Sequence, residues 1–286
     1  MEDGINYDYL ETTAKRSTSD LFIAIQQMSI EEVGRLLLNP LDKYPNLKSA
    51  LPEMPADAIQ IAWTGNAGME LLKQSISFVK TMTHFYEKTY NKNLKGSKIL
   101  DYGCGWGRLI RLMYKFTSPD NIYGCDAWQQ SLQICLDTRV RANLRMCAEV
   151  PETIPFNDVK FDLIYAFSVF THLSEKTGLS VISALRRVLS DDGMLAVTIR
   201  PLDYWKNHDQ KQSPVDVTKM EYEHRKRGFA FTPHNRSPIN GDITYGDTSI
   251  SLDFIAKYWN GLKIVGEESF TVDPFQKIIY LQPVLP

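Results

Sequence analysis

The chain has 286 residues, of which 43% are hydrophobic and 23% are charged, and its formal net charge is -2. This length suffices for one large domain or for a domain with an appendage, and the composition is that of a globular protein. The small negative charge excludes a global positive field that would attract nucleic acid, so we expect no nucleic-acid partner unless a local basic patch provides the contact.

The sequence pattern of the first part of the chain predicts helices and does not predict a membrane segment. Residues 1–20 lack the basic-then-apolar order of a signal peptide, and no apolar run in the sequence approaches the ~18 residues that cross a bilayer. We therefore expect a cytoplasmic protein without a membrane partner, and the oligomeric state is left open. Helical periodicity at 20–38 and again at 68–90 predicts that residues 1–90 form an N-terminal helical segment, interrupted by four prolines between 39 and 55.

Beyond this segment, short apolar runs alternate with longer helical patterns. The predicted helices lie near 107–116, 128–141 and 174–189, and a polar turn is expected at 190–193. The predicted strands are residues 98–102, 121–126, 144–147, 161–167 and 194–200. Alternation of this kind predicts a parallel sheet with helices on both faces.

The C-terminal part departs from the alternation. Residues 203–247 are polar, aromatic and rich in turn formers, and they are too long for an ordinary connection, which predicts an inserted cover after the fifth strand. A helix at 251–259 and strands at 261–270 and 275–284 follow. Because only a short turn separates these two strands, they must be antiparallel. We therefore predict a seven-stranded, mostly parallel α/β sheet whose last strand is antiparallel.

The four cysteines do not indicate a metal site or a disulfide framework. No Cys-x-x-Cys spacing occurs, and most of them lie in or beside apolar, strand-like segments. We interpret them as small buried residues and expect no metal ligands among them.

Residues 101–107, Asp-Tyr-Gly-Cys-Gly-Trp-Gly, end a predicted strand and open a helix. Glycines at such a turn let the backbone approach a ligand. The G-x-G-x-x-G pattern of dinucleotide sites fails because its third glycine position is Arg108, and no Gly-Lys-Ser/Thr of a phosphate loop follows. The carboxylate of Asp101 suits an ammonium group and repels a pyrophosphate. Asp126, at the end of the next strand, can accept hydrogen bonds from both hydroxyls of a ribose.

These motifs resemble those of class I S-adenosylmethionine-dependent methyltransferases, over roughly residues 85–283. The resemblance implies a Rossmann-like domain at 91–286 containing the insert 203–247, and S-adenosylmethionine as the cofactor. Carried over to this chain, the cofactor-binding residues are Asp101, Gly103, Cys104, Gly105, Trp106, Gly107, Asp126, Ala127, Trp128, Ala148, Glu149 and Phe167. Two of these have an alternative interpretation, because Glu149 can also be a solvated loop acid and Trp128 a packing residue.

Residues that follow the fourth and fifth strands are the candidates for binding the methyl acceptor, because ligands of open α/β sheets bind outside the carboxyl ends of the strands. His172 is the candidate catalytic base, with helix capping or packing as the alternative role. The candidate substrate-binding residues are Arg200, Tyr204, Trp205 and His234.

The expected function is methyl transfer to an oxygen or nitrogen atom of a small molecule or sugar. Two alternatives stay open. One is a nucleic-acid or protein methyltransferase, although the sequence lacks the Asn/Asp-Pro-Pro-Tyr/Phe motif of base-methylating enzymes after the fourth strand. The other is a regulatory protein that binds S-adenosylmethionine without catalysis.

Overall fold

The computed structural model describes residues 4–208, 214–269 and 272–285. Contacts between Cα atoms divide it into two compact units, residues 1–146 and 147–286, which are described separately below. The proposed boundary between a helical segment at 1–90 and a domain at 91–286 stays a prediction.

Unit 1 begins with helices, as the sequence predicts. They are α1 (Tyr7–Arg16), α2 (Thr18–Ile25), α3 (Ile30–Leu38), α4 (Pro45–Ala50), α5 (Asp57–Thr64) and α6 (Gly68–Tyr90). The predicted helical stretch 20–38 is two helices, and a capping box between Ser29 and Glu32 starts the second one. The proline-rich stretch 39–55 contains one short helix, α4, with Pro45 in its first turn.

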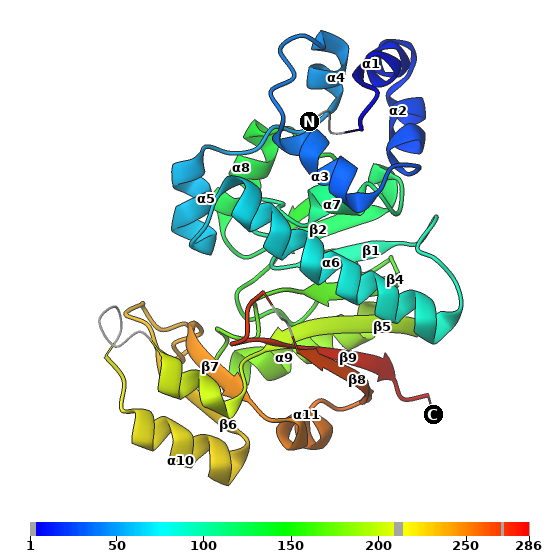
Figure 1. Cartoon of the computed structure of the whole chain (residues 1–286). Helices are drawn as coiled ribbons and strands as arrows, with labels where there is room; N and C mark the ends of the chain where they lie inside the picture. The colour runs from blue at the N-terminus through cyan, green and yellow to red at the C-terminus, as the bar shows by residue number, and fades with distance from the viewer. Residues whose placement is uncertain (1–3, 209–213, 270–271, 286) are drawn as a thin grey trace. The chain divides into compact units, whose positions relative to one another are not determined.

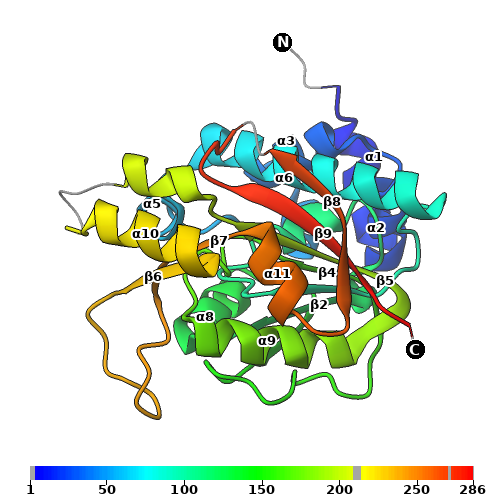
Figure 2. The same cartoon turned by 90° about the horizontal axis from the view of Figure 1, so that it is seen from below.

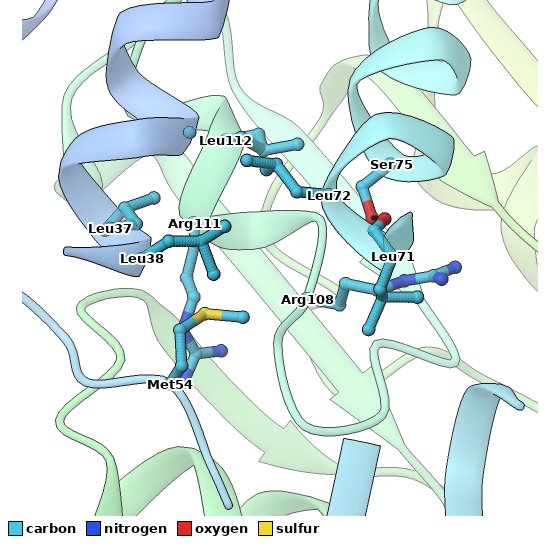
Figure 3. A pocket seen from close by; sticks show the side chains of 10 residues that line it. Leu37, Leu38, Met54, Leu71, Leu72, Ser75, Arg108, Arg111 and Leu112 are labelled. Carbon is cyan, nitrogen blue, oxygen red and sulfur yellow. Dashed lines mark hydrogen bonds between the residues drawn. The ribbon is translucent and has the colours of Figure 1, made fainter. Parts of the chain in front are cut away.

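Helices α3 and α6 pack closely, because a Cβ atom at Gly34 would lie 2.8 Å from Leu72. Figure 3 shows the small cavity that this packing leaves, lined mainly by leucines from both helices together with Met54 and Arg111. Its volume of about 20 Å³ is enough for a single water molecule. The cavity is therefore a packing defect and not a cofactor pocket.

Three parallel strands complete unit 1: β1 (Ile99–Tyr102), β2 (Ile122–Asp126) and β3 (Asn143–Met146). The 3₁₀ helix η1 (Pro119–Asn121) precedes β2, and α8 (Gln129–Asp137) joins β2 to β3. The helix predicted at 107–116 is reduced to α7 (Ile110–Met113), flanked by turns. The φ angle of Gly107, 75°, excludes an α-helical start at that residue.

Unit 2 supplies four strands and the helices that connect them. The strands are β4 (Phe161–Ala166), β5 (Leu189–Ile199), β8 (Leu262–Ser269) and β9 (Lys277–Pro283), and the helices are α9 (Glu175–Val188) and α11 (Leu252–Tyr258). Strands β4 and β5 are parallel, whereas β9 is antiparallel to both β5 and β8. The turn expected at 190–193 is instead an irregularity within β5, where the register moves from Phe161–Leu189 to Leu163–Met194.

The strand order is β3-β2-β1-β4-β5-β9-β8, and Figure 1 labels all of these strands except β3. This is a mostly parallel, seven-stranded α/β sheet with an antiparallel last strand, and the predicted fold class is confirmed. Within the described ranges, no helix combines the length and the apolar character needed to span a membrane.

The insert after β5 has its own small fold in unit 2. It contains the 3₁₀ helix η2 (Leu202–Asn207), α10 (Val217–Arg227), β6 (Phe229–Pro233) and β7 (Gly246–Ile250). Strands β6 and β7 form an antiparallel pair, and α10 packs beside β6 (Figure 2). The amides of Gly246 and Thr248 donate to the carbonyls of His172 and Thr171, at 2.8 and 2.9 Å. These bonds attach the insert to the segment that follows β4.

Candidate functional site

The glycine loop at the end of β1 has a backbone that side chains would disfavour. Gly103, Gly105 and Gly107 have φ angles of 72°, 53° and 75°. A Cβ atom at Gly107 would lie 3.2 Å from the Cys135 sulfur, so packing also leaves little room for a side chain there. At Gly105, no atom of the described residues lies within 4 Å of the equivalent position. The loop backbone is therefore open to a ligand at Gly105.

Asp126 ties this loop to the end of β2. Its Oδ2 accepts a hydrogen bond from the Gly105 amide at 2.9 Å, and its Oδ1 accepts one from the Trp128 amide at 2.8 Å. Burial raises the pKa of Asp126, while the hydrogen bonds from Trp128 and Gly105 oppose this shift. A side-chain hydrogen bond with Ser131 adds to them. A carboxylate has about four acceptor positions, so it can still accept from a ribose hydroxyl.

The other predicted cofactor residues of unit 1 lie in or beside this loop. Asp101, Cys104 and Trp106 are buried, and Trp106 packs in a cluster with Leu71. A hydrogen bond with Cys135, together with burial, raises the pKa of the Cys104 thiol. Cys104 and Trp106 therefore present backbone rather than side chain to a ligand. Their assignment to the cofactor, like that of Ala127 and Trp128, stays a prediction.

Three predicted cofactor residues, Ala148, Glu149 and Phe167, belong to unit 2. The Glu149 carboxylate accepts a hydrogen bond from the Thr244 hydroxyl at 2.8 Å, so it is engaged by the insert. Phe167 follows β4, and the next residue, Ser168, has a φ of 59°, which is uncommon for a residue other than glycine. These three assignments also stay predictions.

A buried carboxylate on β7, that of Asp247, contacts most of the residues that were predicted to bind the substrate or to act as the base. The Oδ1 atom of Asp247 accepts from Arg200 Nη1 at 2.6 Å and from the Tyr204 hydroxyl at 3.1 Å. The Arg200 guanidinium also lies 4.1 Å above the centre of the Tyr204 ring. Burial alone raises the pKa of Asp247, but Arg200 and the neighbouring histidines outweigh it and hold that pKa below its ordinary value.

Two histidines bind the other oxygen of this carboxylate. Asp247 Oδ2 lies 3.0 Å from His234 Nε2 and 3.2 Å from His208 Nε2. An ionised carboxylate only accepts hydrogen bonds, so both Nε2 atoms carry hydrogen. The His208 side chain is 4% exposed and its Nδ1 is buried with no partner among the described atoms, whereas the His234 side chain is 34% exposed.

His172, the predicted base, lies beside the same carboxylate, with its Nδ1 3.8 Å from Asp247 Oδ1. Its Nδ1 donates to the Gly246 carbonyl at 2.8 Å, so its Nε2 has the lone pair, 3.4 Å from Arg200 Nη2. Burial, assisted by the charge of Arg200, lowers the pKa of His172 to about 3. The imidazole is therefore neutral near pH 7 and a weak proton acceptor. We call these residues the Asp247 cluster: Asp247, His172, Arg200, Tyr204, His208 and His234.

Trp205, also predicted to bind substrate, is hydrogen-bonded to Ser249 and not to Asp247. It is fully buried, and its Nε1 donates to Ser249 Oγ at 2.7 Å. The Ser249 hydroxyl is also hydrogen-bonded to Nδ1 of His224, at 2.7 Å. In the part of the chain that the structure describes, no group of three or more His, Cys, Asp or Glu residues is arranged to hold a metal ion.

Sequence reasoning missed Asp247 and Ser249, the two residues that organise this region. Neither lies in a recognisable spacing, because the partners of Asp247 are spread from His172 to His234.

Comparisons with known proteins agree with the fold. Residues 100–197 match the family model described as a methyltransferase domain. The sterol 24-C-methyltransferase erg6 of Schizosaccharomyces pombe is 24% identical over 163 residues, which cover 55% of this chain and 42% of that protein. The chain spans at most about half the length of the curated relatives it matches.

Two solved structures share the fold at low sequence identity. An S-adenosylmethionine-dependent methyltransferase from Clostridium acetobutylicum has a TM-score of 0.50 and 12% identity, covering 79% of this chain and 96% of its own. Magnesium protoporphyrin IX methyltransferase from Synechocystis PCC 6803 has a TM-score of 0.50 and 15% identity, covering 79% and 92%. The glycine loop and the strand order agree with a Rossmann-like fold, and the similarity to the methyltransferase domain model covers residues 100–197 of the chain.

Proposed function

We propose that this protein transfers a methyl group from S-adenosylmethionine to an oxygen or nitrogen atom of a polar small molecule, such as a sugar. The observation that carries the proposal is the loop from Asp101 to Gly107, bonded through Gly105 to Asp126, in a chain that matches the methyltransferase domain model.

The residues of the loop fit this cofactor chemically. When bound, S-adenosylmethionine supplies an electrophilic methyl group on a sulfonium centre. Asp101 is a buried acid at the end of β1 and suits the ammonium of the methionine part. Asp126 keeps lone pairs for the ribose hydroxyls, and the open backbone at Gly105 admits a ligand. A pyrophosphate in this loop would meet the Asp101 carboxylate, which favours a cofactor without phosphates.

The Asp247 cluster supports a polar acceptor. His172 follows β4 and Arg200 follows β5, at the carboxyl ends where ligands of α/β sheets bind. The imidazole, guanidinium and phenol groups of this cluster can form hydrogen bonds with hydroxyl or amine groups of a substrate. They are poorly suited to binding an apolar ring system. This cluster favours a hydroxylated or amino acceptor over a sterol, although two curated relatives are named for sterol methylation.

Within the cluster, His234 is better suited than His172 to take a proton from the acceptor. Asp247 holds the Nε2–H of His234 and leaves Nδ1 as its second nitrogen, in a side chain that is 34% exposed. A carboxylate that orients an imidazole in this way is a recurring feature of general bases. His172 is the weaker candidate because burial and Arg200 lower its pKa to about 3.

The test starts with the cofactor. Calorimetry with S-adenosylhomocysteine should show binding to the wild type and, for Asp126→Ala, an affinity lower by at least about tenfold, since hydrogen bonds to a charged group are worth about 1.5–3 kcal/mol. Asp137→Ala, at the end of α8, is the matched control and should bind normally. If the wild type does not bind, or if Asp126→Ala binds as well as the wild type, the cofactor assignment is wrong.

The acceptor is then sought with radiolabelled S-adenosylmethionine and a panel of sugars, polyols, amines, RNA and proteins. Transfer to a hydroxylated or amino small molecule supports the proposal. Transfer to RNA or protein alone supports the nucleic-acid or protein alternative, and tight cofactor binding with no transfer to any panel member supports a regulatory protein.

A further inference from the structure

The side chain of Gln276 lies across the end of β5 in unit 2. Gln276 immediately precedes β9, whose first residue, Lys277, pairs with Ile199 at the end of β5. Its Nε2 donates to the hydroxyl of Ser168, which follows β4, at 3.4 Å. Because β4 and β9 lie on opposite sides of β5, this bond crosses the carboxyl end of β5, where ligands of open α/β sheets bind.

Asp273 fixes the orientation of the Gln276 amide. Its Oδ2 accepts from Gln276 Nε2 at 2.7 Å, and its Oδ1 accepts from the backbone amide of Phe275 at 3.2 Å. The backbone amide of Gln276 also donates to the Asp273 carbonyl, at 3.1 Å. A carboxylate only accepts hydrogen bonds, so the NH₂ end of the glutamine side chain has to face it. Oε1 is therefore directed away from Asp273.

The Oε1 atom of Gln276 is buried and has no hydrogen-bond partner among the residues that the structure describes. The residue as a whole is 7% exposed. A buried acceptor without a partner destabilises a folded protein, and most such groups in native proteins are satisfied by protein, water or a ligand. At the carboxyl end of the sheet, a bound molecule with a hydroxyl or amine group can satisfy it.

Ser168, which contacts this amide, has an unusual backbone conformation. Its φ angle is 59°, in the left-handed region that favours glycine. Its backbone amide donates to Thr198 Oγ1 on β5 at 2.7 Å, and its hydroxyl lies 3.4 Å from Thr171 Oγ1. Both threonines are fully buried, whereas Ser168 is partly exposed. Strained residues that are held by their surroundings are concentrated at binding and catalytic sites, which supports a ligand site beside Gln276.

The Asp247 cluster adjoins this position without using Gln276. The Thr171 carbonyl accepts from Arg200 Nη1 at 2.8 Å, which connects the segment after β4 to the cluster. Within the described ranges, the side-chain hydrogen bonds of Gln276 are made to Asp273 and Ser168 and not to members of the cluster. If the cluster binds the group that is methylated, Oε1 is left for a different group of the same molecule.

We propose that Gln276 is a substrate-binding residue whose Oε1 accepts a hydrogen bond from a second hydroxyl or amino group of the methyl acceptor, and that Asp273 is its positioning residue. This inference rests on the proposed function, because it takes the acceptor to bind at the Asp247 cluster. It narrows the acceptor to molecules with more than one hydrogen-bond donor, such as a sugar or an amino sugar, and excludes a simple alcohol or amine.

The experiment measures kcat/KM with radiolabelled S-adenosylmethionine, using glucose, galactose and glucosamine as probes together with the monodeoxy forms of the two hexoses. For the wild type, we expect one deoxy form to be at least about tenfold poorer than its parent sugar, because a site built to bind a hydroxyl rejects an analogue that lacks it. Gln276→Met removes the amide at similar volume and should accept both forms within about twofold of each other. A merely structural role would lower both values and keep their ratio.

A second pair of variants tests the positioning residue and keeps the experiment decisive should Gln276→Met not fold. Asp273→Ala removes the group that orients the amide and should reduce the preference for the parent sugar about threefold. Asp273→Asn can still accept from Gln276 Nε2 and should restore it. Gln27→Met, in the exposed turn after α2, is the matched control and should keep the wild-type preference. Calorimetry with S-adenosylhomocysteine checks that each variant is folded.

Three results would overturn the inference while leaving the proposed function intact. They are a wild type that methylates a probe without preference among the deoxy forms, a wild-type preference in Gln276→Met, and a wild-type preference in Asp273→Ala where the methionine variant is unfolded. Absence of transfer from the wild type to any of these sugars also overturns the inference. The wider acceptor panel of amines, polyols, RNA and proteins then decides the proposed function.

Discussion

Arg200 and Asp247 form an ion pair that joins the end of β5 to the insert, with 2.6 Å between Nη1 and Oδ1. The two side chains are only 13% and 8% exposed. Arg200 is also bonded through its backbone, because its carbonyl accepts from the Ile250 amide at 3.0 Å. The pair therefore fixes β7 to the sheet within unit 2 and at the same time sets the charge of the Asp247 cluster.

Replacing Asp247 by Asn should destabilise the protein by about 3 kcal/mol, because removal of one partner leaves the buried Arg200 charge uncompensated. Urea unfolding measures this change. Asp203→Asn is the matched control, since the Asp203 side chain is 77% exposed and pairs only with a surface lysine among the described ion pairs. Equal stability of the two variants would contradict the role of the ion pair.

Stability should fall as the pH is lowered from 7 to 4.5, in part because of His172. Its pKa is about 3 in the folded protein, whereas an unfolded histidine has a pKa of about 6.5. Between these values the unfolded state binds the proton and the folded state does not, so protonation favours unfolding. His172 should contribute a loss of about 2 kcal/mol by pH 4.5.

The pH effect is tested with His172→Gln, which keeps a donor for the Gly246 carbonyl and removes the titrating group. Urea unfolding at pH 7, 5.5 and 4.5 should show a shallower decline for this variant than for the wild type. His84→Gln, on the exposed side of α6, is the control. If His172→Gln and the wild type lose stability equally, His172 is not a buried neutral imidazole.

Arg111→Met should destabilise the protein by about 3 kcal/mol. The guanidinium is 1% exposed and donates to the carbonyls of Trp106 and Glu53 and to the Thr138 hydroxyl. Burial lowers the pKa of Arg111 to about 10, so it is still charged at neutral pH. Methionine fills a similar volume but leaves these acceptors without their donor.

Thermal and urea unfolding of Arg111→Met should be compared with Arg16→Met, whose guanidinium is 72% exposed. The surface variant should behave like the wild type. Because Arg111 holds the carbonyl of Trp106 within the glycine loop, affinity for S-adenosylhomocysteine should also fall several-fold. Wild-type stability in Arg111→Met would show that the three hydrogen bonds do not stabilise this part of unit 1.

Much of the fold follows from local patterns. The strands at β1, β2 and β4 are short apolar runs, and the antiparallel pair β8–β9 follows from the short turn between them. The helix after the glycine loop is shorter than its periodicity suggests, in part because Gly107 adopts a positive φ angle. Backbone conformation in the loop therefore overrides the helical pattern.

The sequence by itself contains the residues that we propose for the cofactor. The residues from Asp101 to Gly107 are contiguous and Asp126 ends the following strand, so a linear motif contains the chemistry that admits a positively charged nucleoside without phosphates. Only the tertiary structure brought together the Asp247 cluster, which we propose for the acceptor. Asp247 contacts Arg200 and His208 across 47 and 39 positions, and Gln276 contacts Ser168 across 108. Contacts of this range depend on how strands and helices pack, which local periodicity does not encode.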